Sequence, residues 1–232
     1  MRSFIFDVDG TLTPSRGRIN KHFAIWFKNF ATHNNCYIVT GSDKSKTVEQ
    51  LGSTIYNLMA RSYQCSGNDV YEGSRNVYTA DVNWDPHTLG FFQRELNRSA
   101  YPFRTGVHAE HRPGLINFSI IGRRASVMQR KDYVKWDNQE KERQGIVNRF
   151  NKQFPQYQAS VAGELGIDIV IRGADKSQIL PDFYDKGDIH FFGDSCEPGG
   201  NDYEIALAVE SISGYVHYVK DWKDTWERLK NL

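Results

Sequence analysis

Two aspartates near the N-terminus carry the clearest chemical signal in the sequence. Asp7 and Asp9 follow the apolar run Phe4–Phe6, which predicts a buried strand, and Gly10 then turns the chain. Side chains two residues apart on a strand point the same way, and ligands of open α/β sheets gather where the strands end. The two carboxylates should therefore lie together, where they would repel each other unless a cation held them. The usual partner is a hard cation with oxygen ligands, such as Mg²⁺.

Further features indicate a site for phosphate. Thr40, Gly41 and Ser42 follow a second apolar strand and open a helix, where hydroxyl groups and backbone N–H groups can bind a phosphate. Lys176 supplies a cation able to neutralise a nucleophile and a phosphoryl group. The glycine-rich segment 193–202 adds acidic oxygens for a metal. Each stretch is common by itself as a turn, a solvated lysine or a loop, so the prediction rests on their combination.

The elements around these residues have the order of an α/β fold. Aromatic residues recur at helical spacing over 23–30, between predicted strands at 4–6 and 36–40. The next helix is expected to present one apolar face over 48–59. A strand at 189–194, a last strand and an amphipathic C-terminal helix follow. Alternating strands and helices are typical of a parallel sheet, so we predict an α/β fold.

The pattern changes between residues 81 and 173. Hairpin-like strands, a short helix after Trp84 and a helix around 146–154 indicate an α+β module. We therefore predict a core of residues 1–80 and 174–232, with residues 81–173 inserted as a second domain. The strands of this module are expected at 108–112, 116–121, 157–161 and 167–172.

Together, and in this order, the four stretches resemble the four motifs of the haloacid dehalogenase (HAD) superfamily of phosphotransferases. The resemblance implies that Asp7 attacks phosphorus to form an aspartyl phosphate, and that Asp9 is the general acid and base. It implies Mg²⁺ held by Asp7, the backbone carbonyl of Asp9 and Asp194. Asp202 would support the metal from outside its ligand shell, and Lys176 would complete the catalytic group. The predicted fold is an HAD-like parallel-sheet core with an inserted α+β cap.

Longer segments resemble eukaryotic-type phosphomannomutases within this superfamily. The resemblance spans nearly the whole chain, in the order core, cap, core. It implies binding of a sugar phosphate, with family arginines on the distal phosphate and an aspartate on the sugar hydroxyls. The planar guanidinium group suits phosphate bidentately. The matching segments are 7–16, 41–52, 110–117, 121–123 and 198–205. The predicted substrate-binding residues are Arg16, Arg112, Asn117, Arg123, Arg130 and Asp168.

Two reactions remain open on this scaffold. A phosphomannomutase would interconvert mannose 1-phosphate and mannose 6-phosphate, whereas a sugar-phosphate phosphatase would give the same phosphoryl group to water. Favouring the sugar by about 100:1 requires about 2.7 kcal/mol between the two barriers. Arginines that hold a second phosphate favour the mutase. Thr40, Ile120 and Gly166 depart from the family pattern, in which glycine, proline and serine are usual. A catalytically inactive binding protein is disfavoured, because Asp7 and Lys176 are both present.

Composition limits the partners. The 232 residues carry a formal net charge of +1, which gives no overall attraction to nucleic acid or membranes. The three cysteines, Cys36, Cys65 and Cys196, form neither a disulfide framework nor a zinc pattern. Neither a signal peptide nor an apolar run of ~18 residues is evident. We expect a cytoplasmic enzyme that binds a sugar phosphate and Mg²⁺. The resemblance implies a homodimer through the cap and leaves open whether hexose 1,6-bisphosphate is needed as an activator.

Overall fold

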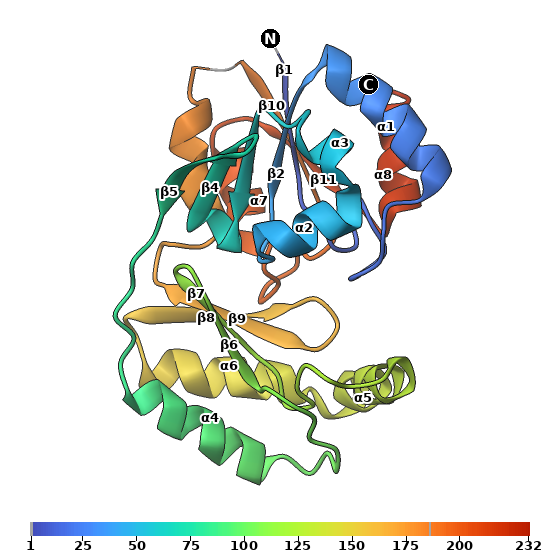
Figure 1. Ribbon diagram of the computed structural model, residues 1–232. Coiled ribbons are helices and arrows are strands. Elements are labelled where there is room, and N and C mark those ends of the chain that lie inside the picture. The colour runs from blue at the N-terminus through green and yellow to red at the C-terminus, as the bar shows by residue number, and fades with distance from the viewer. Residues whose placement is uncertain (1, 186) are drawn as a thin grey trace.

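The computed structural model describes residues 2–185 and 187–232, which form two bodies stacked one above the other (Figure 1). The upper body, here called the core, holds a seven-stranded sheet, and the lower body, the cap, holds a four-stranded sheet. Both ends of the chain lie on the core. The chain passes between the bodies at about residues 80–86 and 172–175, so the predicted boundaries at 81 and 173 fall within these connections.

The core sheet is parallel around its centre, as predicted. Its order is β11-β10-β1-β2-β3-β4-β5, and among these described strands only β4 is reversed, since it pairs antiparallel with both β3 and β5. The central strand β1 is buried from Ser3 to Phe6 because helices cover both faces of the sheet. The strands are β1 (Arg2–Phe6), β2 (Asn35–Val39), β3 (Arg61–Gln64), β4 (Asp69–Glu72), β5 (Arg75–Thr79), β10 (Asp188–Gly193) and β11 (Tyr215–Tyr218).

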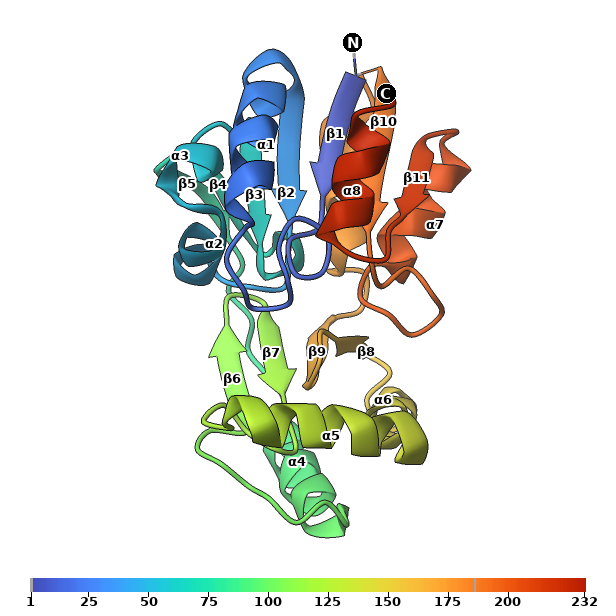
Figure 2. The ribbon, with the colours of Figure 1, turned by 90° about the vertical axis from the view of Figure 1, so that its right-hand side faces the viewer.

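Helices pack on both faces of the core sheet. Phe23 and Phe27 of α1 pack with Phe4 and Phe6 on one face, together with α3 and α8. The segments η2 and α7 cover the opposite face around Ile5. Figure 2 shows α1 and α8 side by side in front of the sheet. The core helices are α1 (Lys21–His33), α2 (Lys44–Leu51), α3 (Ser53–Tyr56), α7 (Tyr203–Ser211) and α8 (Trp222–Leu229), with the 3₁₀ segments η1 (Cys65–Gly67) and η2 (Lys176–Phe183).

One core helix differs from the prediction. The sequence predicts one continuous apolar helical face over 48–59, but the structure divides this stretch into α2 and α3 at Gly52. Gly52 has φ = +79°, a left-handed conformation that glycine adopts without a Cβ clash and that ends a helix. Its N–H bonds to the carbonyl of Val48, which closes α2.

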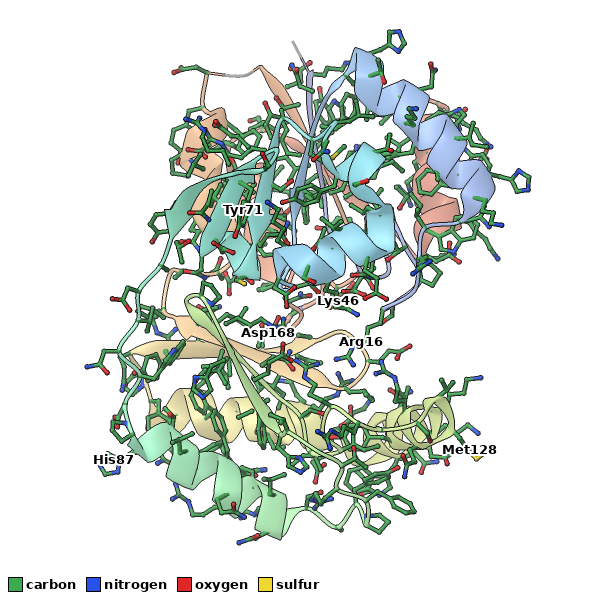
Figure 3. All side chains as sticks on the ribbon, viewed as in Figure 1. Arg16, Lys46, Tyr71, His87, Met128 and Asp168 are labelled. Carbon is green, nitrogen blue, oxygen red and sulfur yellow. The ribbon has the colours of Figure 1, made fainter. Side chains whose placement is uncertain are left out.

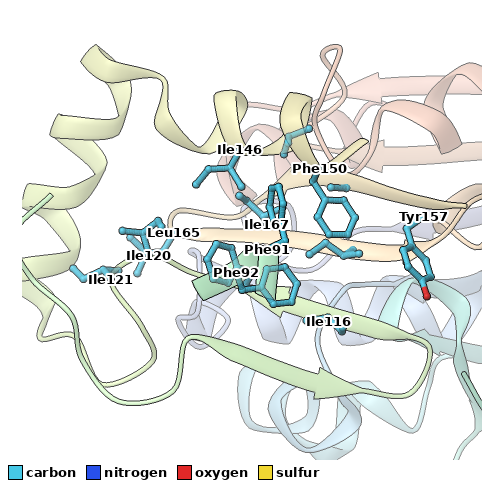
Figure 4. Close-up of a cluster of buried hydrophobic side chains, with 14 of the residues drawn as sticks. Phe91, Phe92, Ile116, Ile120, Ile121, Ile146, Phe150, Tyr157, Leu165 and Ile167 are labelled. Atoms are coloured by element: carbon cyan, nitrogen blue, oxygen red, sulfur yellow. The ribbon is translucent and has the colours of Figure 1, made fainter. Parts of the chain in front are cut away.

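The cap is an antiparallel sheet with three helices on the face turned away from the core (Figure 2). Ile167 and Ile169 belong to the apolar cluster between the sheet and the helices, whereas Asp168 lines the cavity that faces the core. Figure 4 shows how Phe91, Phe92 and other apolar side chains fill the cluster. The strand order is β6-β7-β9-β8. The elements are α4 (His87–Arg98), β6 (Ala109–Arg112), β7 (Leu115–Phe118), α5 (Val127–Glu140), α6 (Glu142–Gln153), β8 (Tyr157–Ala162) and β9 (Gly166–Ile171).

All four predicted cap strands are confirmed within a few residues, but α5 was not predicted. Ser126 and Gln129 form a reciprocal capping box that begins α5. Only Tyr133 and Asp137 of this helix are buried, so its sequence has little apolar periodicity. None of the helices described for residues 2–185 and 187–232 has the length and apolar character that a membrane span requires.

Candidate active site

The predicted catalytic residues meet at the end of the core sheet that faces the cap. Asp7 follows β1, Thr40 follows β2, and Asp194 follows β10, so three neighbouring parallel strands end at the same place. A cavity of about 500 Å³ opens there, lined by residues of both bodies. The sheet therefore gathers residues that lie far apart in the sequence.

Lys176 joins two aspartates at the base of the cavity. Its Nζ lies 2.6 Å from Oδ1 of Asp7 and 2.6 Å from Oδ1 of Asp202, and only 1% of the lysine is exposed. Burial disfavours the charged lysine, but the two carboxylates more than offset this effect and hold the pKa of Lys176 above its usual value. Burial raises the pKa of Asp7; Lys176 opposes this shift, and Asp202 and Asp194 add to it.

Asp9 is held in place by three donors. Its Oδ1 accepts hydrogen bonds from Nε2 of Gln50 at 2.9 Å and from the backbone N–H of Arg16 at 2.5 Å. Its Oδ2 accepts a longer bond of 3.3 Å from Oγ of Ser42. Gln50 was not predicted as a site residue. Its segment matched the family, but a glutamine inside a helix usually faces solvent, and its contact crosses from α2 to the loop after β1.

The segment 40–42 forms a tight turn between β2 and α2. Oγ1 of Thr40 accepts the N–H of Ser42 at 3.1 Å, and both residues are buried. A Cβ on Gly41 would lie 2.4 Å from Oδ2 of Asp168, so only glycine lets the cap strand approach this closely. Asp43 begins α2 by accepting the N–H of Lys46 at 2.8 Å.

Three carboxylates are close enough to share one metal ion. Oxygens of Asp7, Asp194 and Asp202 lie within 4.8 Å of one another. Asp194 is open to the cavity, but partial burial and repulsion from Asp202 raise its pKa to about 7. A Cβ on Gly10 would lie 2.1 Å from Oδ2 of Asp194, so glycine makes room for this carboxylate. Crowded acidic oxygens suit a hard divalent cation such as Mg²⁺, and the residues present fit that ion.

Asp202 lies beside the predicted metal ligands. One of its oxygens is within 4.8 Å of oxygens of Asp7 and Asp194, and its predicted place outside the ligand shell stays a prediction. Its other roles are structural: it is fully buried, binds Lys176, and accepts the N–H of Ser195 at 3.2 Å. The carboxylate of Asp9 lies outside the cluster and is engaged by its three donors, so its predicted contribution through the backbone carbonyl stays a prediction.

Two predicted arginines of the cap are fixed by one glutamate. Oε1 of Glu110 pairs with Nε of Arg112 at 3.0 Å, and Oε2 pairs with Nη2 of Arg123 at 2.5 Å. Arg112 also donates from Nη1 to the backbone carbonyl of Gly41 at 2.5 Å, which links cap to core. Arg123 donates to Oδ1 of Asn117 at 2.6 Å. Glu110 lines the cavity and was not predicted as a site residue.

Asn117 and Asp168 face the core from adjacent strands. They pair directly in the register of β7 and β9, and Nδ2 of Asn117 donates to Oδ1 of Asp168 at 2.5 Å. A Cβ on Gly166 would lie 2.7 Å from Nδ2 of Asn117. The amide of Asn117 thus occupies the space beside Gly166.

Arg16 and Arg130 complete the predicted cationic group. Arg16 comes from the core, has φ = +54°, and lines the cavity. Burial lowers its pKa to about 10, and repulsion from Arg123 and Arg130 adds to the shift, so these guanidinium groups converge from both bodies. Arg130 pairs with Oε2 of Glu164 at 3.1 Å. Among the residues that the structure describes, Glu164 lines the cavity and Arg130 does not.

The cap also contacts the acidic loop of the core. The N–H of Val161 donates to the carbonyl of Gly199 at 2.9 Å, and Nε2 of Gln158 donates to Oε1 of Glu204 at 3.2 Å. Strand β8 is thus joined to the segment that carries Asp194. With the bond from Arg112 to Gly41, these contacts join the cap to the core at two places.

Comparison with known proteins places this arrangement in a family. Residues 25–232 match the model of the eukaryotic phosphomannomutases. The chain belongs to this family. It is 35% identical over 245 residues to a phosphomannomutase of Saccharomyces cerevisiae, covering 98% of this chain and 92% of the relative. A phosphomannomutase of Spinacia oleracea is 30% identical over 236 residues, with 98% and 94% covered. The predicted family is confirmed.

Solved structures show the same fold at low sequence identity. An IMP-nucleotidase of Plasmodium falciparum aligns with a TM-score of 0.66 at 15% identity, covering 99% of this chain and 67% of that one. A sugar phosphatase of HAD subclass IIB aligns with a TM-score of 0.62 at 16% identity, covering 100% and 98%. The predicted HAD-like α/β fold with an inserted cap is confirmed.

Proposed function

We propose that this protein is a phosphomannomutase that interconverts mannose 1-phosphate and mannose 6-phosphate through an aspartyl phosphate on Asp7. One observation carries the proposal. Asp7, which is bound by the buried Lys176, lines the same cavity as a second cationic group from the cap, which includes Arg123. A site for the transferred phosphoryl group thus faces a site for a second phosphate, and a substrate with a phosphate at each end fits both.

The residues of the core provide the chemistry. Phosphorylated Asp7 gives its phosphoryl group to the free hydroxyl of the bound hexose monophosphate, whose proton moves to Asp9. After the resulting bisphosphate turns, Asp7 attacks its other phosphorus in line, and Asp9 returns the proton to the sugar oxygen that leaves. Because Oδ1 of Asp9 already accepts two hydrogen bonds, Oδ2 is the atom that carries the proton. Lys176 holds the carboxylate of Asp7 and balances its charge.

Asp7 and Asp194 would hold Mg²⁺ together with the backbone carbonyl of Asp9, and Asp202 would support the ion from outside its ligand shell. When bound, the ion neutralises phosphoryl charge. The cap positions the substrate. Glu110 fixes two arginines for the distal phosphate, and residues of the cap line the cavity opposite Asp7, so a bound substrate under the cap would limit the access of water.

The fate of the phosphate tests the proposal. Purified protein, Mg²⁺, mannose 1-phosphate and a catalytic amount of hexose 1,6-bisphosphate are followed by ³¹P NMR, with and without the bisphosphate. We expect mannose 6-phosphate to form without free phosphate. Accumulation of inorganic phosphate would instead mean that water reaches the aspartyl phosphate, and the protein would be a sugar-phosphate phosphatase.

A further inference from the structure

Lys46 is a cation of the cavity wall that the mechanism above does not use. It lies in the first turn of α2, where its N–H is fixed by Oδ1 of Asp43 at 2.8 Å. Its side chain is half-buried and lines the cavity together with Arg16. Figure 3 shows Lys46 below α2, on the side that faces the cap, in the same region as Arg16 and Asp168. The helix therefore presents the ammonium group to the space where the substrate would lie.

The cations of the cap and of the core differ in their partners. Arg112 and Arg123 are held by Glu110, and Arg130 is held by Glu164. By contrast, within residues 2–185 and 187–232 the structure records neither a hydrogen bond nor an ion pair for the ammonium of Lys46 or the guanidinium of Arg16. A half-buried charge without a protein partner is costly and is relieved by a ligand of opposite charge.

The surroundings of Lys46 support this view. Burial lowers the pKa of Lys46; Asp9 opposes this shift, and repulsion from Arg16 and Arg130 adds to it. The cations of the two walls thus lie close enough to repel one another. An anion between them would stabilise all of these charges at once.

We infer that Lys46 joins Arg16 on the core wall and binds the phosphate of the sugar phosphate that is not being transferred. The inference rests on the proposed function and deepens it, because it makes Lys46 a determinant of specificity for ligands with two phosphate groups. An ammonium on a flexible stem is a point charge without a fixed fork, so it can follow a phosphate that changes position. The cap arginines, clamped by glutamates, hold one orientation.

Lys44 is a matched control in the same turn of the same helix. Its Nζ donates to the carbonyl of Ser74 at 3.2 Å and lies 4.0 Å from the ring centre of Tyr71. It is not among the described lining residues of the cavity. Lys44→Gln therefore removes a charge from α2 without changing the proposed subsite, whereas Lys46→Gln removes the charge that faces the cavity.

Calorimetry tests the inference. It measures the binding of glucose 1,6-bisphosphate and of p-nitrophenyl phosphate in the presence of Mg²⁺. Both lysine changes are made in the Asp7→Asn background, which prevents turnover. We expect Lys46→Gln to weaken bisphosphate binding about tenfold, equivalent to about 1.4 kcal/mol, and to weaken p-nitrophenyl phosphate binding much less. Lys46→Arg should restore most of the affinity for the bisphosphate, and Lys44→Gln should leave the affinity for both ligands unchanged.

The outcomes separate the inference from the proposed function. Unchanged bisphosphate affinity in Lys46→Gln, equal losses for the two ligands, or absence of bisphosphate binding in the parent would each overturn the subsite. Release of inorganic phosphate in the NMR experiment would reject the mutase reaction alone. In that case a selective loss of bisphosphate affinity in Lys46→Gln would still support the subsite.

Discussion

The amide of Gln50 donates a hydrogen bond from Nε2 to Oδ1 of Asp9, over 2.9 Å. The same nitrogen lies 3.1 Å from Oγ1 of Thr13, and only 2% of Gln50 is exposed. A buried side chain of α2 thus orients the carboxylate that we assign as acid and base. Because the donor acts on the Oδ1 atom, it leaves Oδ2 to exchange the proton with the sugar.

Replacing this donor should slow the chemical step. We expect Gln50→Met, which keeps the length of the side chain but removes the amide, to lower kcat by about 10- to 100-fold, within the range for general acid–base catalysis. KM should change little, since Gln50 does not line the cavity among the described residues. Steady-state kinetics checks this, with circular dichroism as the control for folding. A rise in KM at constant kcat would contradict a positioning role.

The nucleophile is tested by a single atom change. Asp7→Asn should abolish both turnover and formation of a phosphoenzyme, because an amide does not attack phosphorus as a carboxylate does. The fold should persist, since Lys176 keeps its ion pair with Asp202 at 2.6 Å. Labelling with a ³²P-labelled bisphosphate followed by acid precipitation measures the phosphoenzyme. Normal labelling of the variant would exclude Asp7 as the nucleophile.

The sequence located the parts of the site that depend on short spacing. Asp7 and Asp9 are two residues apart at the end of a buried strand, so local rules suffice for them. Contacts across the fold were not predictable in the same way. The hydrogen bond from Gln50 to Asp9 spans 41 residues and depends on how α2 is rotated. The double role of Asp202 depends on the burial of Lys176, which no spacing in the sequence reveals.

The elements of the fold also differ in how well the sequence predicts them. Strands with alternating or wholly apolar residues, such as β9 and β1, were predicted because one or both of their faces are buried. Strand β5 was missed because all five of its residues are exposed, so its polar sequence carries no alternation. Helix α5 was missed for a related reason, since packing against the cap uses few of its apolar residues.

The role of Arg123 can be separated from general phosphate binding. Arg123→Ala should raise KM for mannose 1-phosphate about tenfold or more, because a charge-assisted bond contributes about 1.5–3 kcal/mol. Turnover of p-nitrophenyl phosphate should change far less, since that ligand lacks a distal phosphate. Arg124→Ala, at the exposed neighbouring position, is the matched control and should behave as the parent protein. Equal effects of Arg123→Ala on both substrates would argue against a distal-phosphate site.

Removal of divalent metal should stop the reaction reversibly. The oxygens of Asp7, Asp194 and Asp202 lie within 4.8 Å of one another, and the single charge of Lys176 offsets only part of the repulsion among three carboxylates. We expect excess EDTA to abolish turnover and added Mg²⁺ to restore it, measured by the same ³¹P assay. Binding of Mg²⁺ should also raise the melting temperature, because the ion binds the folded protein preferentially. Full activity in excess EDTA would remove Mg²⁺ from the proposed mechanism.

A pair of histidines far from the cavity should make stability depend on pH. Nδ1 of His190 lies 3.1 Å from Nε2 of His217, and the rings stack against each other and on Phe192 and Tyr215. Burial lowers the pKa of His217 to about 4, with added repulsion from His190 and Arg228. Burial also lowers the pKa of His190.

The sign of the effect follows from these shifts. Both folded-state values lie below the unfolded value of about 6.5, so the unfolded chain binds more protons as the pH falls towards 4. The stabilising effect of the neutral pair is complete above pH 6.5 and is lost below it. We expect the urea midpoint to fall between pH 7.5 and pH 5, and His217→Phe, which keeps an aromatic ring, to reduce this difference. The exposed His22, changed to Gln, should leave it unaltered; an equal fall in His217→Phe and the parent would show that other groups are responsible.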